Sequence, residues 1–390
     1  MPAAFLSEMS SAPIHGGGVT LHRVLRGDLA RFSWMAKTIH YPSEVATSYD
    51  SASRQHQYPW WRIAPVLRPF LGCTIAHKAA FHPLTRIAFA KSVARRILRD
   101  EACAQQTKLL VCPQAEITLI VLEELRKRAS ISYITWMMDD HLVRWSDGQW
   151  VYPAGVGERM HLHLNAAERV HVISPAMQRF YKERFGVDST VLCGPATPTY
   201  SYQTHPTGKH LRLAYFGSLG RWQNDALTVL VPALRTGEIS LDIFTHNPEL
   251  IPSPLKIAGT RLHPGVGASA VLPLSGTYDA VVLPISFRNE LRNMSFFNIA
   301  TKFSECMASG VPTLIIGPGD AIMVEIATKH GAGVIINQCD ADSLENALAD
   351  LRNPSRRAKV VAAALALAHK EFSDATMQSR WESSSAFLFD

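Results

Sequence analysis

Residues 278–317 read YDAVVLPISFRNELRNMSFFNIATKFSECMASGVPTLIIG, and this stretch decides the fold. An apolar run that ends at Pro284 predicts a buried strand, and a polar, basic loop follows it. The residues from Thr301 to Gly310 predict a helix, and VPTLIIG (311–317) predicts a second strand. The stretch therefore predicts a strand–loop–helix–strand unit of a parallel sheet.

The start of this predicted helix has the composition of an anion site. Backbone N–H groups at a helix N-terminus attract negative charge, and cationic side chains beside them strengthen the attraction. The polar residues concerned are Arg288, Arg292, Asn293, Thr301 and Lys302. Glu305 lies one turn into the helix, where a carboxylate can accept from two ribose hydroxyls. The alternative is a surface helix with a simple Lys302–Glu305 ion pair, but the turn residues of ASGVP favour the functional interpretation.

Outward from this stretch, strands and helices alternate through both halves of the chain. The strand-like runs are 3–9, 109–113, 131–138, 170–174, 211–217, 241–245, 279–285 and 332–336. The helical patterns cover 19–32, 115–128, 225–234, 321–330, 342–351, 355–372 and 375–389. This alternation predicts an α/β protein with two Rossmann-like domains, each a doubly wound parallel sheet. The Pro-, Thr- and Gly-rich segment 192–210 predicts a linker, which gives domains over 1–195 and 208–372.

Length and composition agree with two globular domains. The chain has 390 residues, of which 47% are hydrophobic and 18% are charged. No uninterrupted apolar run reaches the roughly eighteen residues of a membrane helix, and the N-terminus lacks the basic region of a signal peptide. The six cysteines form no CxxC spacing, so we interpret them as reduced thiols in a cytoplasmic setting.

Three consecutive glycines, Gly16, Gly17 and Gly18, follow the first strand-like run. Glycine at this point lets a helix N-terminus approach a phosphate or a sugar closely. A plain turn is the alternative interpretation. We expect no ordinary NAD site, because GxGxxG is absent and no acidic residue follows at the spacing of a ribose contact.

Asp139, Asp140 and His141 directly follow the predicted strand 131–138. The carboxyl end of a strand is where doubly wound sheets place reactive groups, so these side chains are catalytic candidates that orient an acceptor or act as a base. The alternative is a helix N-cap formed by one of the two aspartates. The sequence leaves both interpretations open.

A basic stretch without any acidic residue covers 54–99. Residues 84–100 can be drawn as a basic amphipathic helix, with Ile87, Ala90 and Ala94 on its apolar side. Such a helix can lie on an anionic membrane surface. The alternative is a solvated basic helix that packs on the sheet. We expect no nucleic-acid partner, because no nucleic-acid-binding motif accompanies the charge.

The run KFSECMASGVPTL (302–314) resembles the K-x-x-E-x-M-A-x-G-x-P signature of GT-B glycosyltransferases. It is similar to the glycogen-synthase-like group, known as family 4 or group 1, especially its bacterial cell-surface polysaccharide enzymes. Four further stretches match in the same order as in that family: PIHGGGVTLHRVL (13–25), RVHVISPAMQRFYKERFGV (169–187), LRLAYFGSLGRW (211–222) and YDAVVLPIS (278–286). The sequence departs from the family at Phe297, where many relatives carry a second glutamate, and at Gln223-Asn224, where many carry a lysine.

The resemblance implies two Rossmann-like domains that face a cleft, with the helix of residues 373–390 returning to the N-terminal domain. It implies that Glu305 holds the ribose of a nucleotide-sugar donor. The remaining donor-binding residues that it implies are Gly17, Gly18, Gly217, Ser218, Arg221, Arg292, Asn293, Thr301 and Lys302. It implies no cofactor and no required metal, because cations and a helix dipole can stabilise the leaving diphosphate.

The activity implied is hexosyl transfer, with retention of configuration, to a glycan or lipid-linked acceptor in cell-surface polysaccharide synthesis. The expected location is the cytoplasm, with peripheral attachment at the inner face of the membrane as a candidate refinement. Two other functions stay open at this point. One is a sugar-nucleotide epimerase of the same fold, and the other is a non-catalytic glycosyltransferase-like subunit, suggested by Phe297.

Overall fold

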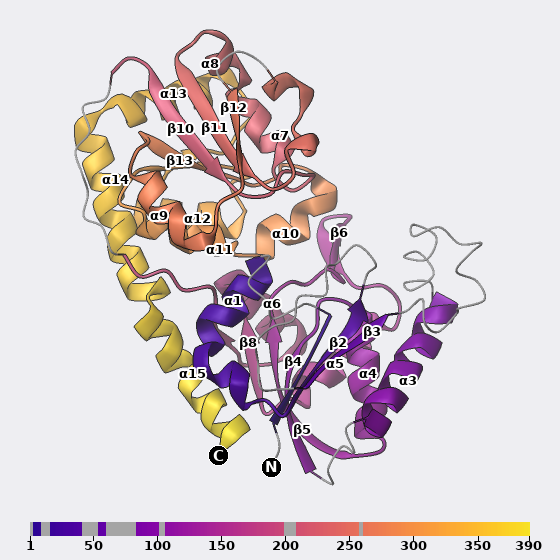
Figure 1. The fold of residues 1–390 in the computed structure, drawn as a ribbon. Helices are drawn as coiled ribbons and strands as arrows, with labels where there is room; N and C mark the ends of the chain where they lie inside the picture. Colours follow the sequence, from indigo (N-terminus) through magenta and orange to yellow (C-terminus); the bar gives the residue numbers. More distant parts are fainter. Residues whose placement is uncertain are drawn as a thin grey trace. The chain divides into compact units, whose positions relative to one another are not determined.

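A computed structural model describes residues 3–8, 16–40, 54–59, 83–100, 106–198, 208–256 and 260–390. The chain divides into two compact units (Figure 1). The first comprises Met1–Cys193 and Gln378–Asp390, and the second comprises Gly194–Met377. The last helix, α15 (Asp374–Phe389), therefore begins in the second unit and ends in the first.

The first unit is built on a parallel sheet of seven strands in the order β3-β2-β1-β4-β5-β8-β9. The strands are β1 (Ala3–Ser7), β2 (Trp34–His40), β3 (Arg54–Pro59), β4 (Gln106–Cys112), β5 (Ser130–Met137), β8 (Arg169–Val172) and β9 (Thr190–Val191). The helices are α1 (Gly16–Leu25), α3 (Pro83–Asp100), α4 (Glu116–Arg126), α5 (Val156–Asn165), α6 (Pro175–Phe185) and α15. Figure 1 shows α3 and α4 on one face of the sheet and α1 and α15 on the other. Because both faces are covered, strands such as β1 are buried throughout and mostly apolar.

The second unit contains a parallel sheet of six strands in the order β12-β11-β10-β13-β14-β15. The strands are β10 (Leu211–Phe216), β11 (Ile239–Thr245), β12 (Thr260–Pro264), β13 (Ala280–Pro284), β14 (Thr313–Ile316) and β15 (Val334–Ile336). The helices are α7 (Asn224–Leu227), α8 (Val231–Arg235), α9 (Ala268–Ser275), α10 (Arg292–Phe297), α11 (Thr301–Ala308), α12 (Ile322–His330), α13 (Ala341–Arg352) and α14 (Pro354–Leu367). The predicted α/β class with two doubly wound parallel sheets is confirmed.

Two predicted helices are interrupted for local reasons. The helix expected over 19–32 ends at Leu25 and continues as a 3-10 helix over Arg26–Arg31. Arg26 adopts a positive φ of 37°, which an α-helix does not accommodate. The helix expected over 225–234 is split into α7, a 3-10 turn and α8. Pro232 lies at the start of α8, where it removes a backbone donor from the helical ladder.

Helix α15 is fastened to the first unit through Trp381. Its side chain is buried, its indole N–H donates to Asp28 Oδ2 at 2.9 Å, and its ring packs on that of Trp136 with centroids 6.3 Å apart. Ser385 donates to the same Asp28 oxygen at 2.7 Å. One buried aromatic ring and one shared carboxylate thus hold the C-terminal segment on this unit.

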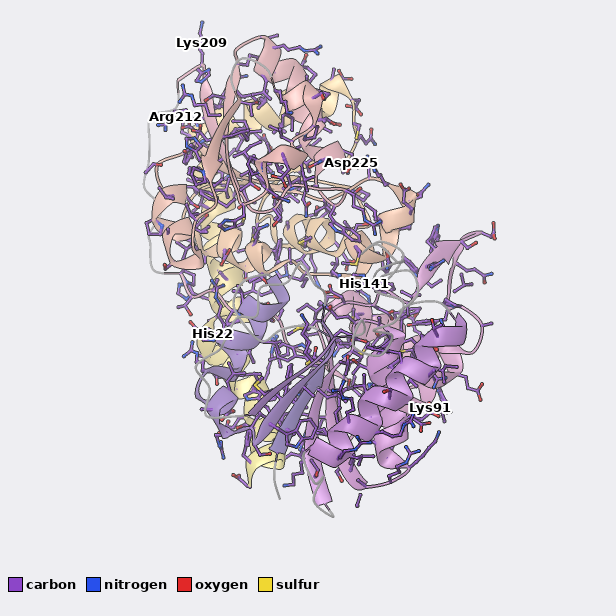
Figure 2. All side chains as sticks on the ribbon, turned by 45° about the vertical axis from the view of Figure 1, so that its right-hand side comes forward. His22, Lys91, His141, Lys209, Arg212 and Asp225 are labelled. Atoms are coloured by element: carbon purple, nitrogen blue, oxygen red, sulfur yellow. The ribbon has the colours of Figure 1, made fainter. Side chains whose placement is uncertain are left out.

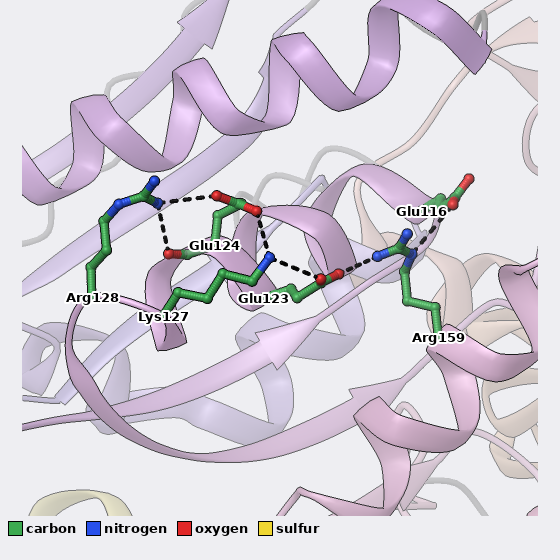
Figure 3. Close-up of polar contacts among 6 residues, drawn as sticks. All are labelled: Glu116, Glu123, Glu124, Lys127, Arg128 and Arg159. Carbon is green, nitrogen blue, oxygen red and sulfur yellow. Dashed lines mark hydrogen bonds and ion pairs between the residues drawn. The ribbon is translucent and has the colours of Figure 1, made fainter.

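Helix α4 and the two residues after it carry a ladder of ion pairs (Figure 3). Glu124 binds Lys127 and Arg128, which follow the end of the helix, at 2.8 and 3.1 Å. Glu123 and Glu116 both bind Arg159 of α5, and Glu116 also binds Arg86 of α3 at 2.9 Å. The buried Glu116 therefore ties three helices together. The exposed pairs of this ladder each contribute little, at most about 1 kcal/mol.

Helix α3 uses its apolar face inside its own unit. Phe89, Ala90, Val93, Ala94 and Ile97 are buried in one core cluster with residues of β1, β4 and α4. The apolar side drawn for membrane binding is thus covered by protein, apart from Ile87, which is 39% exposed. The interpretation of a basic helix packed on the sheet is confirmed for this segment. None of the described helices has the length and apolar character needed to span a membrane.

Two buried histidines make the stability of the first unit depend on pH. Burial lowers the pKa of His163 to about 3 and that of His171 to about 4. His163 is held neutral beside Thr135 Oγ1, 2.8 Å from its Nε2 atom. In the unfolded chain a histidine takes up a proton below about pH 6.5, whereas these two resist protonation when folded. Stability is therefore lost as the pH falls from 6.5 toward 4.

We expect His163→Gln to remove part of this dependence. Between pH 7 and pH 5 the wild-type protein should lose about 2 kcal/mol of unfolding free energy through His163, and the variant should not lose this share. Urea unfolding of the full-length wild type and variant at the two pH values measures this difference in unfolding free energy. His161→Gln, an exposed position on the same helix, is the control. An equal pH-dependent loss in His163→Gln and wild type would contradict the prediction.

Candidate functional site

Gly217 and Lys302 meet at the carboxyl edge of the sheet in the second unit. Gly217 directly follows β10, has a φ of 145°, and donates its N–H to Phe244 O at 2.8 Å. Lys302 reaches over it from α11: a Cβ atom added to residue 217 would lie 1.8 Å from Lys302 Nζ. Only glycine leaves room for the ammonium, so the loop after β10 and the first turn of α11 form one site.

The charge of Lys302 is set by its surroundings. Burial lowers the pKa of Lys302, and the neighbouring charge of Glu305 partly offsets this effect. Its ammonium lies 5.5 Å from the centroid of the Tyr215 ring, at a distance typical of a cation–π contact. A second negative charge placed beside Lys302 would favour its protonated form. The position is therefore suited to an anionic ligand.

Glu305 lies one turn along the same helix. Its side chain is buried, with 6% of the residue exposed, and it lines a small cavity together with Lys302 and Cys306. The N-cap residue of α11 is Ala300, which makes no side-chain cap hydrogen bond, and Thr301 is the first residue of the helix. A cation, a carboxylate and a helix N-terminus thus lie within one turn of helix.

The loop that follows Gly217 is held in place by side chains that sequence reasoning missed. Asn247 accepts from the N–H of Leu219 at 2.9 Å and donates to its carbonyl at 2.7 Å. Asp225 accepts from Ser286 Oγ and from the N–H of Phe287, which joins α7 to the loop after β13 (Figure 2). These hydrogen bonds hold the loop in a defined position.

Ser218 and Arg221 are exposed on the loop that follows Gly217, as expected for ligand-binding positions. The Ser218 carbonyl accepts from Tyr215 Oη at 2.6 Å. This hydrogen bond holds the backbone from which the Ser218 side chain extends. The Arg221 guanidinium lies 4.4 Å above the Trp222 ring. Their roles as donor contacts stay predictions.

Arg292 and Asn293 differ from the sequence interpretation. They were expected in a loop, but they form the first turn of α10. Arg292 makes an ion pair with Asp320, so part of its charge is already neutralised within the unit. Phe297, the last residue of α10, is buried with 1% exposed. A phenylalanine here packs in the core, where a glutamate would be an unsolvated charge.

In the first unit, a chain of hydrogen bonds crosses the ends of three neighbouring strands. Glu8, after β1, accepts from the backbone N–H groups of Gln114 and Thr118 at 2.7 and 2.9 Å. The Gln114 side chain, after β4, donates to Asp139 Oδ2 at 2.9 Å. Burial raises the pKa of Glu8 to about 7, although these N–H groups oppose the rise. Glu8 was not singled out from the sequence, and its position directly after the first strand was the available signal.

Asp140 holds the loop that contains it. It is buried, with 2% exposed, and its Oδ1 atom accepts from the N–H groups of Leu142 and Val143. Its Oδ2 atom accepts from the hydroxyls of Tyr152 and Tyr181 at 2.6 and 3.0 Å. The helix N-cap alternative is wrong, because a β-hairpin follows in place of a helix. Four donors of its own unit thus engage the Asp140 carboxylate.

His141 is the exposed member of the three residues (Figure 2). Asp139 and His141 therefore stay the catalytic candidates at this edge, with Asp140 as the residue that positions them. The glycines Gly16, Gly17 and Gly18 form the first turn of α1, so the plain-turn alternative is wrong for them. Their predicted contact with a donor stays a prediction.

Comparison with solved structures identifies the fold. Over 100% of this chain and 99% of the other, it is similar to sucrose-phosphate synthase from Thermosynechococcus elongatus, with a TM-score of 0.68 and 12% identity. It is similar to HepE of Anabaena, solved in complex with UDP and glucose, over 100% of both chains, with a TM-score of 0.63 and 12% identity. It is also similar to the lipopolysaccharide outer core galactosyltransferase WaaB, over 99% of both chains, with a TM-score of 0.61 and 14% identity. The chain has the GT-B fold. No protein-family model and no curated protein sequence matches it.

We expect Gly217→Ala to weaken the binding of nucleoside diphosphates at least about tenfold. The new methyl group would displace the Lys302 ammonium and so remove one charge-assisted contact. Titration calorimetry with UDP, GDP, ADP and dTDP measures the affinity of the best ligand. Gly237→Ala is the matched control, because Gly237 also has a positive φ, of 73°, but has open space around it. Equal affinities for Gly217→Ala and wild type would refute the role of this contact.

Proposed function

We propose that the protein is a glycosyltransferase that moves a sugar from a nucleotide-sugar donor to a glycan acceptor. The observation that carries this proposal is the convergence of Gly217, Lys302 and Glu305 at the carboxyl edge between β10 and β13. The strand order reverses at this point of the sheet, and doubly wound folds bind their ligands at such a reversal. The comparison structures support the proposal, because they include a galactosyltransferase and a protein holding UDP and glucose.

Glu305 is the proposed ribose contact. Its side chain is buried beside Lys302, and a carboxylate there can accept from two adjacent hydroxyls of a ribose ring. The diphosphate would then lie toward the N-terminus of α11, against Lys302 and the backbone N–H groups of the first turn. Arg221 would approach from the loop after β10. Arg292 is proposed as a weaker contact, because Asp320 already binds it.

The proposed reaction breaks the bond between the anomeric carbon of the sugar and the donor phosphate oxygen. An acceptor hydroxyl forms the new bond to that carbon, and its proton passes to the leaving diphosphate. Lys302 and the helix dipole stabilise the negative charge that develops on the diphosphate, so these residues supply the electrostatic work without a required metal. We propose retention of configuration, in which the phosphate oxygen assists the hydroxyl and no protein nucleophile is used.

The acceptor is proposed to bind at the carboxyl edge of the first unit. Asp139 and His141 lie there, and Gln114 fixes the Asp139 carboxylate. A hexose donor and a cell-surface polysaccharide or glycolipid acceptor are the finer form of the proposal. The non-catalytic alternative had Phe297 as its only support, and the burial of this side chain gives it a packing role instead.

We further propose that the protein acts at the inner face of a membrane, attracted by charge alone. Lys91, Arg95 and Arg99 are exposed on α3 at intervals of one helical turn, and we name them the basic face. Because the apolar side of α3 is covered by its own unit, insertion into the bilayer is not part of the proposal. Each cation near an anionic surface contributes about 1 kcal/mol.

The membrane proposal predicts that reversing all three charges of the basic face to glutamate abolishes binding to vesicles that contain one third phosphatidylserine. Sedimentation with these vesicles at low salt measures binding, and vesicles of phosphatidylcholine alone are the lipid control. Arg356→Glu with Lys359→Glu, exposed positions of the second unit, is the protein control. Unchanged sedimentation of the charge-reversed protein would disprove the proposal.

The donor proposal predicts that Glu305→Ala loses stabilisation by nucleotide sugars. A thermal-shift screen against UDP, GDP, ADP and dTDP sugars should find one that raises the Tm of the wild type. The affinity of Glu305→Ala for that donor should fall at least about tenfold, since two charge-assisted hydrogen bonds are removed.

Glu345→Ala, an exposed position on α13, should bind like the wild type, and Glu305→Gln tests the charge at nearly constant shape. If a well-folded wild-type protein responds to none of these nucleotide sugars, the transferase proposal fails.

A further inference from the structure

A small β-hairpin leaves the carboxyl edge of the first unit directly after His141. It consists of β6 (Arg144–Ser146) and β7 (Gln149–Val151), which pair antiparallel and form a sheet of their own. Figure 1 shows β6 apart from the strands of the main sheet. Asp147 and Gly148 form its turn with φ values of 50° and 80°, the conformation that matches the twist of a tight hairpin. Strands of three residues leave no periodic pattern in the sequence, so this hairpin was not predicted.

The two faces of the hairpin differ in chemistry. Trp145 and Trp150 are direct cross-strand partners and so share one face. Their rings lie edge to face with centroids 4.8 Å apart. The neighbouring positions Arg144, Ser146 and Gln149 are exposed and polar, and they belong to the other face. A hairpin of three residues per strand therefore presents a tryptophan pair.

The tryptophan pair is held by aromatic contacts with α6 and with the residue after β7. Trp150 packs against Phe180 of α6 with centroids 6.4 Å apart, and Tyr152, just after β7, stacks on the same ring. Asp140 supports the base of the hairpin, because it accepts from Tyr152 and from two backbone N–H groups of the loop that leads into β6. Such a short hairpin is marginal by itself, so these contacts hold it in one conformation. Trp150 is thus the ring of the pair that packs on α6.

Both tryptophans stay half-buried, whereas Trp34, Trp136 and Trp381 of the same unit are buried. The face of an indole ring carries negative charge density, which attracts the polarised C–H groups on the apolar face of a sugar ring. Three residues separate Trp145 from His141, which is exposed at the edge proposed to bind the acceptor. Trp145 is therefore close to His141 along the chain.

We propose that the β6–β7 hairpin is the acceptor-recognition element and that Trp145 stacks on a sugar ring of the acceptor glycan. The proposal rests on the transferase function proposed above and identifies the acceptor as a glycan of at least two sugars. One sugar presents the hydroxyl that reacts, and the other lies on Trp145. Trp150 and Asp140 are positioning residues, because they act by holding Trp145.

The test compares the full-length wild type with Trp145→Ala and Trp145→Tyr on an array of oligosaccharides. A saturating concentration of the nucleoside diphosphate that binds the wild type best is present. The strongest ligand of the wild type is then measured by titration calorimetry. We expect Trp145→Ala to lose about tenfold in affinity and Trp145→Tyr to stay within about threefold, because tyrosine also offers an aromatic face. Leu162→Ala, an exposed apolar position of the same unit, should bind like the wild type.

Donor binding separates this proposal from the one on which it rests. Thermal stabilisation by the nucleotide sugar should be equal in wild type and Trp145→Ala, which also shows that the variant is folded. The inference is overturned if the wild type binds nucleotide but no oligosaccharide, if Trp145→Ala keeps its glycan affinity, or if Trp145→Tyr loses as much as Trp145→Ala. It is also overturned if the substitution instead abolishes self-association or vesicle binding. Failure of nucleotide binding in all variants refutes the transferase function itself, independently of the glycan result.

Discussion

In each unit, one strand pairing that departs from chain order decides where chemistry can occur. β1 pairs with β4 in the first sheet, and β10 pairs with β13 in the second. In the first sheet β2 and β3 lie on one side of this pairing, and β5, β8 and β9 lie on the other. In the second sheet β11 and β12 lie on one side, and β14 and β15 lie on the other. The loops at the carboxyl ends therefore turn away from each other and leave room between them. Glu8 and Gln114 lie at the first of these points, and Gly217 lies at the second.

The loops at these edges are held by buried or half-buried polar side chains rather than by regular structure. Asp140 binds backbone N–H groups of its own loop, whereas Glu8, Asn247 and Asp225 bind those of segments far away in the chain. An unsatisfied N–H in such a place would cost about 1–3 kcal/mol, so these contacts are needed whatever the site does. They also fix the exposed residues between them. His141 and Ser218 gain defined positions because their neighbours are bound.

The strongest sequence signals were local ones. The run from Thr301 to Gly310 predicted α11 because apolar spacing and a terminal glycine are properties of adjacent residues. The Gly217 loop was assigned through its resemblance to the donor-domain loop of GT-B glycosyltransferases. The hairpin at Trp145 was missed, since three-residue strands leave no periodic pattern. Arg292 was placed in a loop because its surrounding residues are polar, although they form a helical turn that is closed by the ion pair with Asp320.

By itself the sequence determined the α/β class, the two parallel sheets and the helix that carries Lys302 and Glu305, because hydrophobic period and turn chemistry are written in neighbouring residues. Only the tertiary structure decided that Lys302 occupies the space above Gly217, that Asp140 is a buried anchor, and that α3 turns its apolar face inward. Each of these depends on residues far apart in the chain. Contacts between such residues are set by how the strands are ordered and how side chains fill the space between helices and sheet, and no local pattern records that.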